Sequence, residues 1–302
     1  MLFRSDKEEF SSETYDQEIP ALGHDMQDAI TFNEDKLIYQ KGCTRDCGYH
    51  EYFATSDGSV KAKPDESGYV FTVAEFTLDD ATKYDNMARF EVEHFTYNRT
   101  FSHDGWQALY VPFDFNCGQV NMEDYDITMN NNFHEYELPE GPKVELEVKR
   151  VINGGIIPAL TPCLIRKKSV GEFDDAQTSK FDFRNVAFAS AFEMAFNCSS
   201  FTRNYDFRGT LDRKSQFLGQ GNEYSHFIMK EGELWRVESS KQALDPQRWY
   251  VIAEEKPNAF PIQAAKLNRI AIRVIGDGDT TGIEDIYVTT DDGTANGKKY
   301  VK

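Results

Sequence analysis

The sequence predicts an all-β fold, an antiparallel β-sandwich. Apolar and polar residues alternate with a period of two in many short runs between residues 68 and 275, as expected for strands with one buried face. Gly, Asn, Asp and Pro bound these runs, and the same region shows no pattern of a long amphipathic helix. Many half-buried strands need a second layer, which favours two packed sheets of immunoglobulin-like or jelly-roll-like type, with a barrel as the other option.

Composition and pattern together divide the chain into four parts. Residues 1–18 are acidic and Ser-rich and predict a linker or tail, and residues 19–60 predict a small loop-rich module. Residues 61–276 carry the sandwich pattern, which leaves open a division into two sub-units near residue 170. Residues 277–302 are polar and predict a tether, so we expect the chain to be part of a larger polypeptide.

The strand pattern is clearest at residues 144–151, where Val144, Leu146 and Val148 share one face and charged residues occupy the other. Residues 106–113 are apolar on both faces, which predicts a central strand with Pro112 at a bulge or strand end. Together with these two, further runs give about eleven strands. They lie at 69–76, 90–95, 163–166, 181–188, 205–208, 224–229, 234–237, 248–253 and 269–275.

Residues 182–197 are ambiguous. Their Phe and Ala spacing fits a helix face and a buried pair of strands about equally well, so both interpretations remain open.

Charge and hydropathy exclude two classes of partner. The chain has 33 Lys and Arg against 51 Asp and Glu, a net charge of −18, which is unfavourable for a phosphate backbone and argues against nucleic acid. The sequence contains no run of about 18 apolar residues, the length needed to span a membrane as a helix. Residues 1–10 lack the apolar core of a signal peptide. With 40% hydrophobic and 14% aromatic residues, the chain can bury one sizeable core and a smaller satellite core.

Five cysteines are too few for a disulfide framework in 302 residues. Only Cys43 and Cys47 are close in sequence, and His24 and His50 could complete four zinc ligands with them. Their three-residue spacer is one residue longer than that of a usual zinc knuckle, which favours free thiols over a local disulfide or zinc. We therefore expect no cofactor.

Residues 277–282 match the beginning of a calcium-loop pattern. Asp277 and Asp279 alternate with other residues and Gly282 stands at the sixth position, as in a calcium loop. The twelfth position is Val288 instead of a bidentate Glu, so a Gly/Asp turn is the favoured interpretation.

Aromatic residues are the best candidates for ligand binding, because flat sugar rings stack on exposed Trp and Tyr. Trp235, which has charged neighbours, and Tyr136 are the two candidates, whereas Trp106, Trp249 and Tyr250 lie in apolar segments and are assigned to the core. The sequence lacks a nucleophile elbow, a phosphate-binding glycine loop, a dinucleotide fingerprint and an HExxH motif. We therefore predict no catalytic residues and no enzyme.

Two stretches resemble known families. Residues 95–101, 106–113 (WQALYVPF), 132–136 and 146–148, continuing to about residue 286, are similar to a C-terminal β-rich domain of secreted and surface proteins of anaerobic gut bacteria, also found on leucine-rich-repeat surface proteins. Residues 19–25 with 42–49 are similar to a short surface-protein module that opens with Gly-His and closes on Cys-x-x-Cys-Gly.

These resemblances imply a non-catalytic module of a bacterial secreted or cell-surface protein. Its expected role is that of a spacer or of an adhesion and interaction domain, and its expected partners are glycans or host and cell-surface proteins. The alternative is a carbohydrate-binding module of a polysaccharide-degrading system. The expected location is extracellular or on the cell surface.

Overall fold

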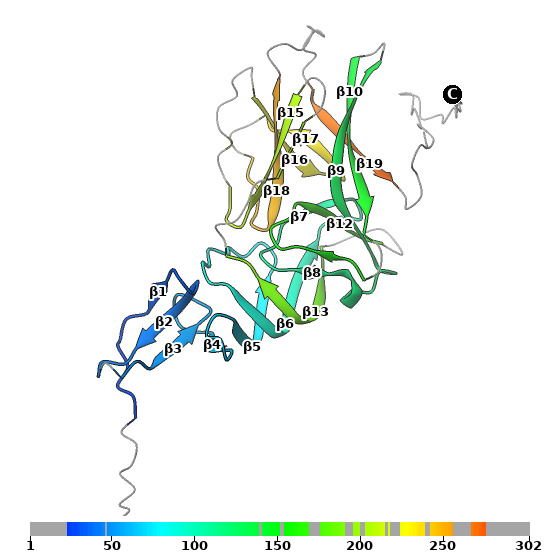
Figure 1. Cartoon of the computed structure of the whole chain (residues 1–302). Coiled ribbons are helices and arrows are strands. Elements are labelled where there is room, and N and C mark those ends of the chain that lie inside the picture. Colours follow the sequence, from blue (N-terminus) through cyan, green and yellow to red (C-terminus); the bar gives the residue numbers. More distant parts are fainter. Residues whose placement is uncertain are drawn as a thin grey trace, which may run out of the picture.

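The computed structural model shows two large sheets arranged one after the other along the long axis of the molecule (Figure 1), and a third sheet of two short strands. It describes residues 23–45, 47–138, 141–151, 154–168, 176–190, 196–199, 203–214, 217, 224–238, 242–255 and 267–275. The predicted tail at 1–18 and tether at 277–302 lie outside these residues.

The predicted all-β fold is confirmed. The described residues form nineteen strands and one short 3-10 turn (Cys117–Gln119), with no α-helix among them and therefore none long enough to cross a membrane. Most neighbouring strands are antiparallel. Two pairs are parallel: β5 (Phe71–Asp79) with β6 (Phe90–Phe101), and β10 (Gly141–Arg150) with β19 (Arg269–Ile275). The architecture is a sandwich-like arrangement of mixed sheets.

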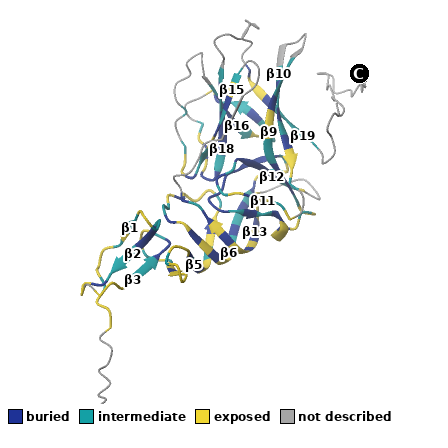
Figure 2. Ribbon diagram, in the orientation of Figure 1, coloured by how far each residue is buried: buried dark blue, intermediate teal, exposed yellow. Residues whose placement is uncertain are grey.

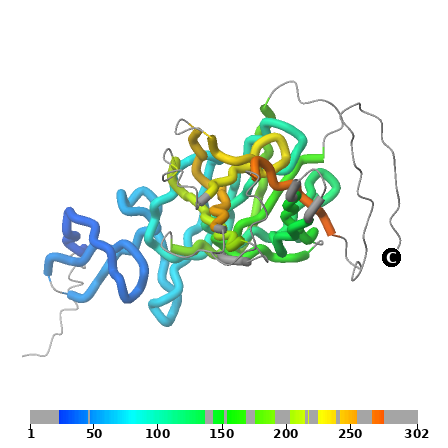
Figure 3. Tube along the Cα trace, turned by 90° about the horizontal axis from the view of Figure 1, so that it is seen from above, coloured from blue at the N-terminus to red at the C-terminus, as the bar shows by residue number. Residues whose placement is uncertain are grey.

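The first sheet has seven strands and contains the N-terminal module. Its strand order is β1-β2-β3-β4-β5-β6-β13. Figure 3 shows β1 to β3 projecting from the rest of the molecule. Strand pairing continues across residue 60, because β4 pairs with both β3 and β5. The strands are β1 (Thr31–Asn33), β2 (Ile38–Gly42), β3 (His50–Phe53), β4 (Lys61–Pro64), β5 (Phe71–Asp79), β6 (Phe90–Phe101) and β13 (Gln177–Phe188).

The second sheet has ten strands and curls on itself. Its order is β14-β15-β18-β16-β17-β19-β10-β9-β12-β7, yet β14 contacts β9, and the ring of Phe133 on β9 stacks on that of Tyr205 on β15 at 3.8 Å. The two halves of the sheet therefore face each other across a shared core. The strands are β7 (Gln107–Leu109), β9 (Tyr125–Leu138), β10 (Gly141–Arg150), β12 (Cys163–Lys167), β14 (Phe196–Ser199), β15 (Arg203–Thr210), β16 (Tyr224–Lys230), β17 (Glu233–Arg236), β18 (Arg248–Glu255) and β19 (Arg269–Ile275).

One continuous core joins the two sheets. Its buried residues extend from Ile38 to Ile270 and pass through both sheets (Figure 2), and a small two-stranded antiparallel sheet of β8 (Phe115–Asn116) and β11 (Ile156–Ile157) adds to it. Phe113 packs near the centre, with its ring 4.6 Å from that of Phe95 and 5.4 Å from that of Phe188. A smaller cluster around Tyr250 is the satellite core.

Residues 182–197 contribute strands in the part that the structure describes. β13 runs to Phe188 and β14 begins at Phe196, so the described part of this stretch is strand and not helix. The two strands do not pair with each other, because β13 belongs to the first sheet and β14 to the second, and residues 191–195 lie outside the described residues.

Residues 106–113, which were predicted to form a central strand, contribute instead a strand at the end of the second sheet. Only Gln107–Leu109 forms a strand, β7, and this strand ends the order of the second sheet. Its residues are buried because other segments cover its free edge: Arg99 Nη2 donates to the Ala108 carbonyl at 2.9 Å. Beyond the strand, Ala189 N–H donates to the carbonyl of Pro112. β7 thus lies at the end of the sheet order, and its residues are nevertheless buried.

The alternation of buried and exposed residues is interrupted at one level of three adjacent strands. Two consecutive residues are exposed at 74–75 in β5, 93–94 in β6 and 184–185 in β13, and the register places these pairs beside one another. Asn185 has a φ of 52°, and the side-chain amide of Gln119 bonds to both backbone groups of Arg184 at 2.6 and 3.1 Å. This shared irregularity positions the pocket described below.

Candidate functional site

Three of the four predicted zinc ligands meet in the N-terminal module. β2 ends at Gly42. The backbone of the next residue, Cys43, forms an isolated antiparallel β-bridge with that of Met26, in the chain segment that precedes β1. The following loop returns so that Cys43 N–H donates to the carbonyl of Tyr49 at 3.0 Å. These backbone contacts bring His24 and Cys47 to the same place.

The ligand atoms of His24, Cys43 and Cys47 all lie within 4.8 Å of one another. Cys47 Sγ is 3.3 Å from His24 Nδ1, and the His24 ring stacks on Tyr49 at 3.7 Å with an angle of 1° between the planes. Cys43 is buried, whereas His24 and Cys47 are exposed. The group is thus fixed on its inner side and open to solvent on the other.

The two thiols are free, and they differ in environment. The pKa of Cys43 is lowered to about 7, first by a hydrogen bond from the backbone of Arg45 and next by the Cys47 side chain. A thiolate is the form of cysteine that binds metals and attacks electrophiles.

His50, the fourth predicted zinc ligand, lies outside this group. Its Nδ1 is 3.0 Å from the carbonyl of Gly48, and its ring lies near Tyr52. The calcium candidates Asp277 and Asp279 lie outside the described residues.

The two predicted ligand-binding aromatics occupy one row across the second sheet. Trp235 on β17 pairs with Arg269 on β19, and Tyr136 on β9 pairs with Lys143 on β10. In the parallel register of β10 and β19 Glu145 pairs with Ala271, and extending this register by two residues sets Lys143 level with Arg269. Because three strand spacings separate the aromatics, they lie about 14 Å apart on the face opposite the core.

Cations cover part of both aromatic side chains. The Lys230 ammonium and the Arg269 guanidinium lie 5.9 and 5.6 Å from the ring centre of the half-buried Trp235. Arg273 donates to the hydroxyl of Tyr136 at 3.2 Å. A sugar ring stacking on Trp235 would therefore compete with these cations.

The three tryptophans and Tyr250 divide as the sequence predicts. Trp106, Trp249 and Tyr250 are 7%, 0% and 8% exposed and belong to the core, and Trp235 is the most accessible tryptophan.

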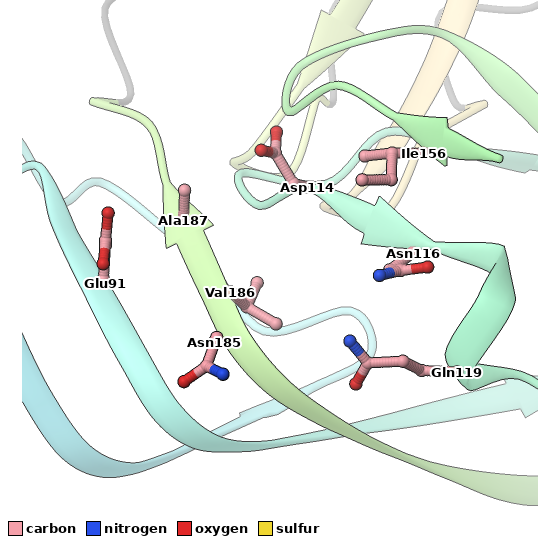
Figure 4. A pocket seen from close by; sticks show the side chains of 8 residues that line it. All are labelled: Glu91, Asp114, Asn116, Gln119, Ile156, Asn185, Val186 and Ala187. Carbon is pink, nitrogen blue, oxygen red and sulfur yellow. The ribbon is translucent and has the colours of Figure 1, made fainter. Parts of the chain in front are cut away.

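A shallow pocket of about 130 Å³ lies beside the irregular level of the first sheet (Figure 4). An adjoining hollow of about 360 Å³ shares Glu91, Asp114 and Ala187 with it. The smaller volume is below, and the larger near the lower end of, the range usual for small-molecule sites. The pocket lining is Glu91, Asp114, Asn116, Gln119, Ile156, Asn185, Val186 and Ala187.

Most polar groups of this pocket already have structural partners. Asp114 Oδ1 accepts from Ala159 N–H at 2.8 Å, and Asn116 Oδ1 accepts from Gly118 N–H at 2.9 Å. Glu91 lies on the far side of β13 from Asp114, with Ala187 between them (Figure 4). The two carboxylates thus do not face each other as an acid and base pair would.

Sequence reasoning did not single out this pocket. Its lining comes from β6, β8, β11, β13, the residue before β8 and the turn after it, so no short spacing connects the residues. The one local signal is the presence of the turn-forming residues Asn116 and Gly118 just after an apolar segment.

No protein-family model matches the sequence, and searches of curated proteins and of solved structures found no significant match.

Proposed function

We propose that the chain is a non-catalytic module of a bacterial secreted or cell-surface protein, which acts as a spacer or as an adhesion and interaction domain. One observation carries this proposal: Trp106 and Trp249, two of the three tryptophans, pack in the core of the second sheet and are not displayed to a ligand. Trp249 is fully buried and donates from Nε1 to the carbonyl of Cys163 at 2.6 Å. Trp106 is buried with the Arg166 guanidinium 4.6 Å from its ring centre.

Buried charged and polar side chains connect the two sheets. Asp80, which follows β5, forms ion pairs with Arg99 on β6 and with Arg248 on β18. Gln247 donates from its side chain to the carbonyls of Asp79 and Thr82 at 2.9 and 3.0 Å. A joint with so many buried polar contacts resists bending, which suits a spacer that presents neighbouring domains.

The proposed lack of catalytic activity is tested with the purified chain and a panel of polysaccharides. We expect no release of reducing sugar above the level of a heat-unfolded sample. Turnover that disappears in Glu91→Gln or Asp114→Asn would overturn the proposal, because these are the acids of the pocket.

The surface location is tested on intact cells that produce the protein. We expect externally added protease to degrade the chain, or the chain to appear in the medium, while a cytoplasmic marker stays intact. Retention with the cytoplasmic marker in both experiments would contradict the extracellular assignment.

The row that contains Trp235 and Tyr136 supports a second candidate, a carbohydrate-binding module. Two aromatics about 14 Å apart on one face could contact separate sugars of a polysaccharide. Binding measured by affinity electrophoresis should then be lost in Trp235→Ala and retained in Tyr69→Ala, an exposed aromatic elsewhere. Equal retention in both variants would exclude this row as the binding surface.

A further inference from the structure

The geometry of the His24, Cys43 and Cys47 group is close to that of a tetrahedral metal site. Zinc binds sulfur at about 2.3 Å and imidazole nitrogen at about 2.0–2.1 Å, so neighbouring ligand atoms of a tetrahedral site lie about 3.5–3.8 Å apart. The measured Cys47 Sγ to His24 Nδ1 distance is 3.3 Å, and all three ligand atoms fall within 4.8 Å. Small side-chain rotations would bring the three atoms around a single ion.

Backbone contacts hold the ligands in place without a metal. Gln27 N–H donates to the Gly42 carbonyl at 2.9 Å, and Thr44 N–H donates to the Asp25 carbonyl at 2.7 Å, on either side of Cys43. The Tyr49 ring stacks on His24 and restricts its orientation. Such preorganisation reduces the entropy lost when an ion binds.

The donor set selects the type of metal. Two thiolates and a neutral imidazole balance the charge of a divalent ion, and soft sulfur ligands favour zinc over calcium or magnesium. The carboxylate of the nearby Asp25 already accepts a hydrogen bond from the Thr44 hydroxyl at 3.1 Å. His24 and Cys47 are exposed, so a fourth coordination position would face solvent.

We propose that His24, Cys43 and Cys47 form a binding site for a thiophilic divalent metal ion, foremost zinc, with the fourth position open to water or to a ligand from a partner. Each thiol loses its proton to solvent on binding, so uptake of one ion releases up to two protons from the cysteines. The site lies in the small N-terminal module, where a bound ion would link the segment before β1 to the end of β2 and the following loop.

Titration of the full, reduced and metal-free chain with Co²⁺ tests this proposal. We expect one equivalent to bind and to give the intense absorption of a tetrahedral cobalt–thiolate complex, which added Zn²⁺ then abolishes. Cys47→Ser and His24→Ala should each weaken binding at least about tenfold, as loss of groups that support a metal site generally does. Both residues are exposed, so these variants are expected to fold, and near-ultraviolet circular dichroism checks this.

His50→Ala is the matched control, because His50 lies in the same module but outside the ligand group. It should retain Co²⁺ binding and the rise in Tm that Zn²⁺ produces in the unaltered chain. Absence of Co²⁺ uptake, or an equal loss of binding in His50→Ala, would overturn the site. So would a Cys43–Cys47 disulfide found by mass spectrometry in protein isolated from the native source without reductant.

Discussion

Arg248 forms a bidentate ion pair with Asp80, a residue 168 positions earlier in the chain, at 2.7 Å from Nη1 to Oδ1 and 2.9 Å from Nη2 to Oδ2. Asp80 follows a strand of the first sheet and Arg248 begins β18 of the second, so this contact joins the two layers directly. Arg99, which is fully buried, also donates to Asp80 Oδ1 at 3.0 Å. A single carboxylate thus pairs with two largely buried cations.

Asp80→Asn should strongly destabilise the protein. The amide keeps the shape of the carboxylate but leaves Arg99 and Arg248 without their shared counter-charge, and breaking a buried ion pair costs about 3–5 kcal/mol. Urea unfolding measures the change. Lys83→Ala is the control, because its ion pairs with Asp85 and Asp212 are exposed and should contribute about 1 kcal/mol or less. A change of similar size in both variants would contradict the role assigned to Asp80.

The same carboxylate predicts a loss of stability in acid. Burial opposes ionisation of Asp80, but the charge of Arg99 and the contacts of Arg248 outweigh it and lower its pKa. The unfolded chain, with an Asp pKa of about 3.9, therefore binds more protons as the pH falls through that value. The contribution of Asp80 to stability is fully present well above this pKa and is lost as the pH falls through the lower pKa of the folded state.

The pH effect is checked by urea unfolding between neutral and acidic pH. We expect the free energy of unfolding to decrease toward acid and the decrease to be smaller in Asp80→Asn. In Asp182→Asn the slope should change less, because that carboxylate is 63% exposed and solvent screens its pair with Lys180. An unaltered slope in Asp80→Asn would show that Asp80 is not the titrating group.

The alternation of apolar and polar residues predicts the position of many strands. It does not predict which strands pair when they are far apart in the sequence. Residues 269–275 were predicted as a strand and match β19, and residues 144–151 overlap β10. The parallel pairing of these two strands could not be predicted, because nothing in either strand encodes a partner more than 120 positions away. Residues 125–138, the longest strand, are not among the eleven predicted runs, because Asn130 to Asn132 have low strand propensity and interrupt the pattern.

The candidate site shows the same limit. The sequence identified Cys43, Cys47 and His24, but it could not distinguish His24 from His50 as the third member. That choice depends on the backbone pairing of the segment before β1 with the residues after β2. A spacing rule for a zinc knuckle does not include such pairing.

The three tryptophans should rank in stability effect by their burial. Trp106→Ala and Trp249→Ala remove fully packed rings and should each cost about 3–5 kcal/mol. Trp235→Ala should cost clearly less, because its ring is half-buried on the outer face. Chemical unfolding of the three variants checks the order, and a cost below about 0.5 kcal/mol for Trp106→Ala or Trp249→Ala would exclude its place in the core.

Gly209 and Tyr110 should be energetically coupled. A Cβ at Gly209 would overlap the ring of Tyr110, which is 5% exposed and packs against this part of β15. Gly209→Ala therefore forces the ring or the strand to move and should cost about 1–3 kcal/mol, as overpacking does. Gly23→Ala is the control, because a Cβ there meets no atom within 4 Å.

A double-mutant cycle separates this contact from a general effect on the strand. If the overlap with the ring is the cause, Tyr110→Ala should remove most of the cost of the added methyl group, and the double variant should be more stable than the sum of the single effects predicts. Strict additivity within about 0.3–0.5 kcal/mol would mean that Gly209 is required for its backbone alone. Gly209 pairs with Trp249 across β15 and β18, in the second sheet. Coupling between Gly209 and Tyr110 would show that the packed Tyr110 ring leaves room only for glycine at this point of the sheet.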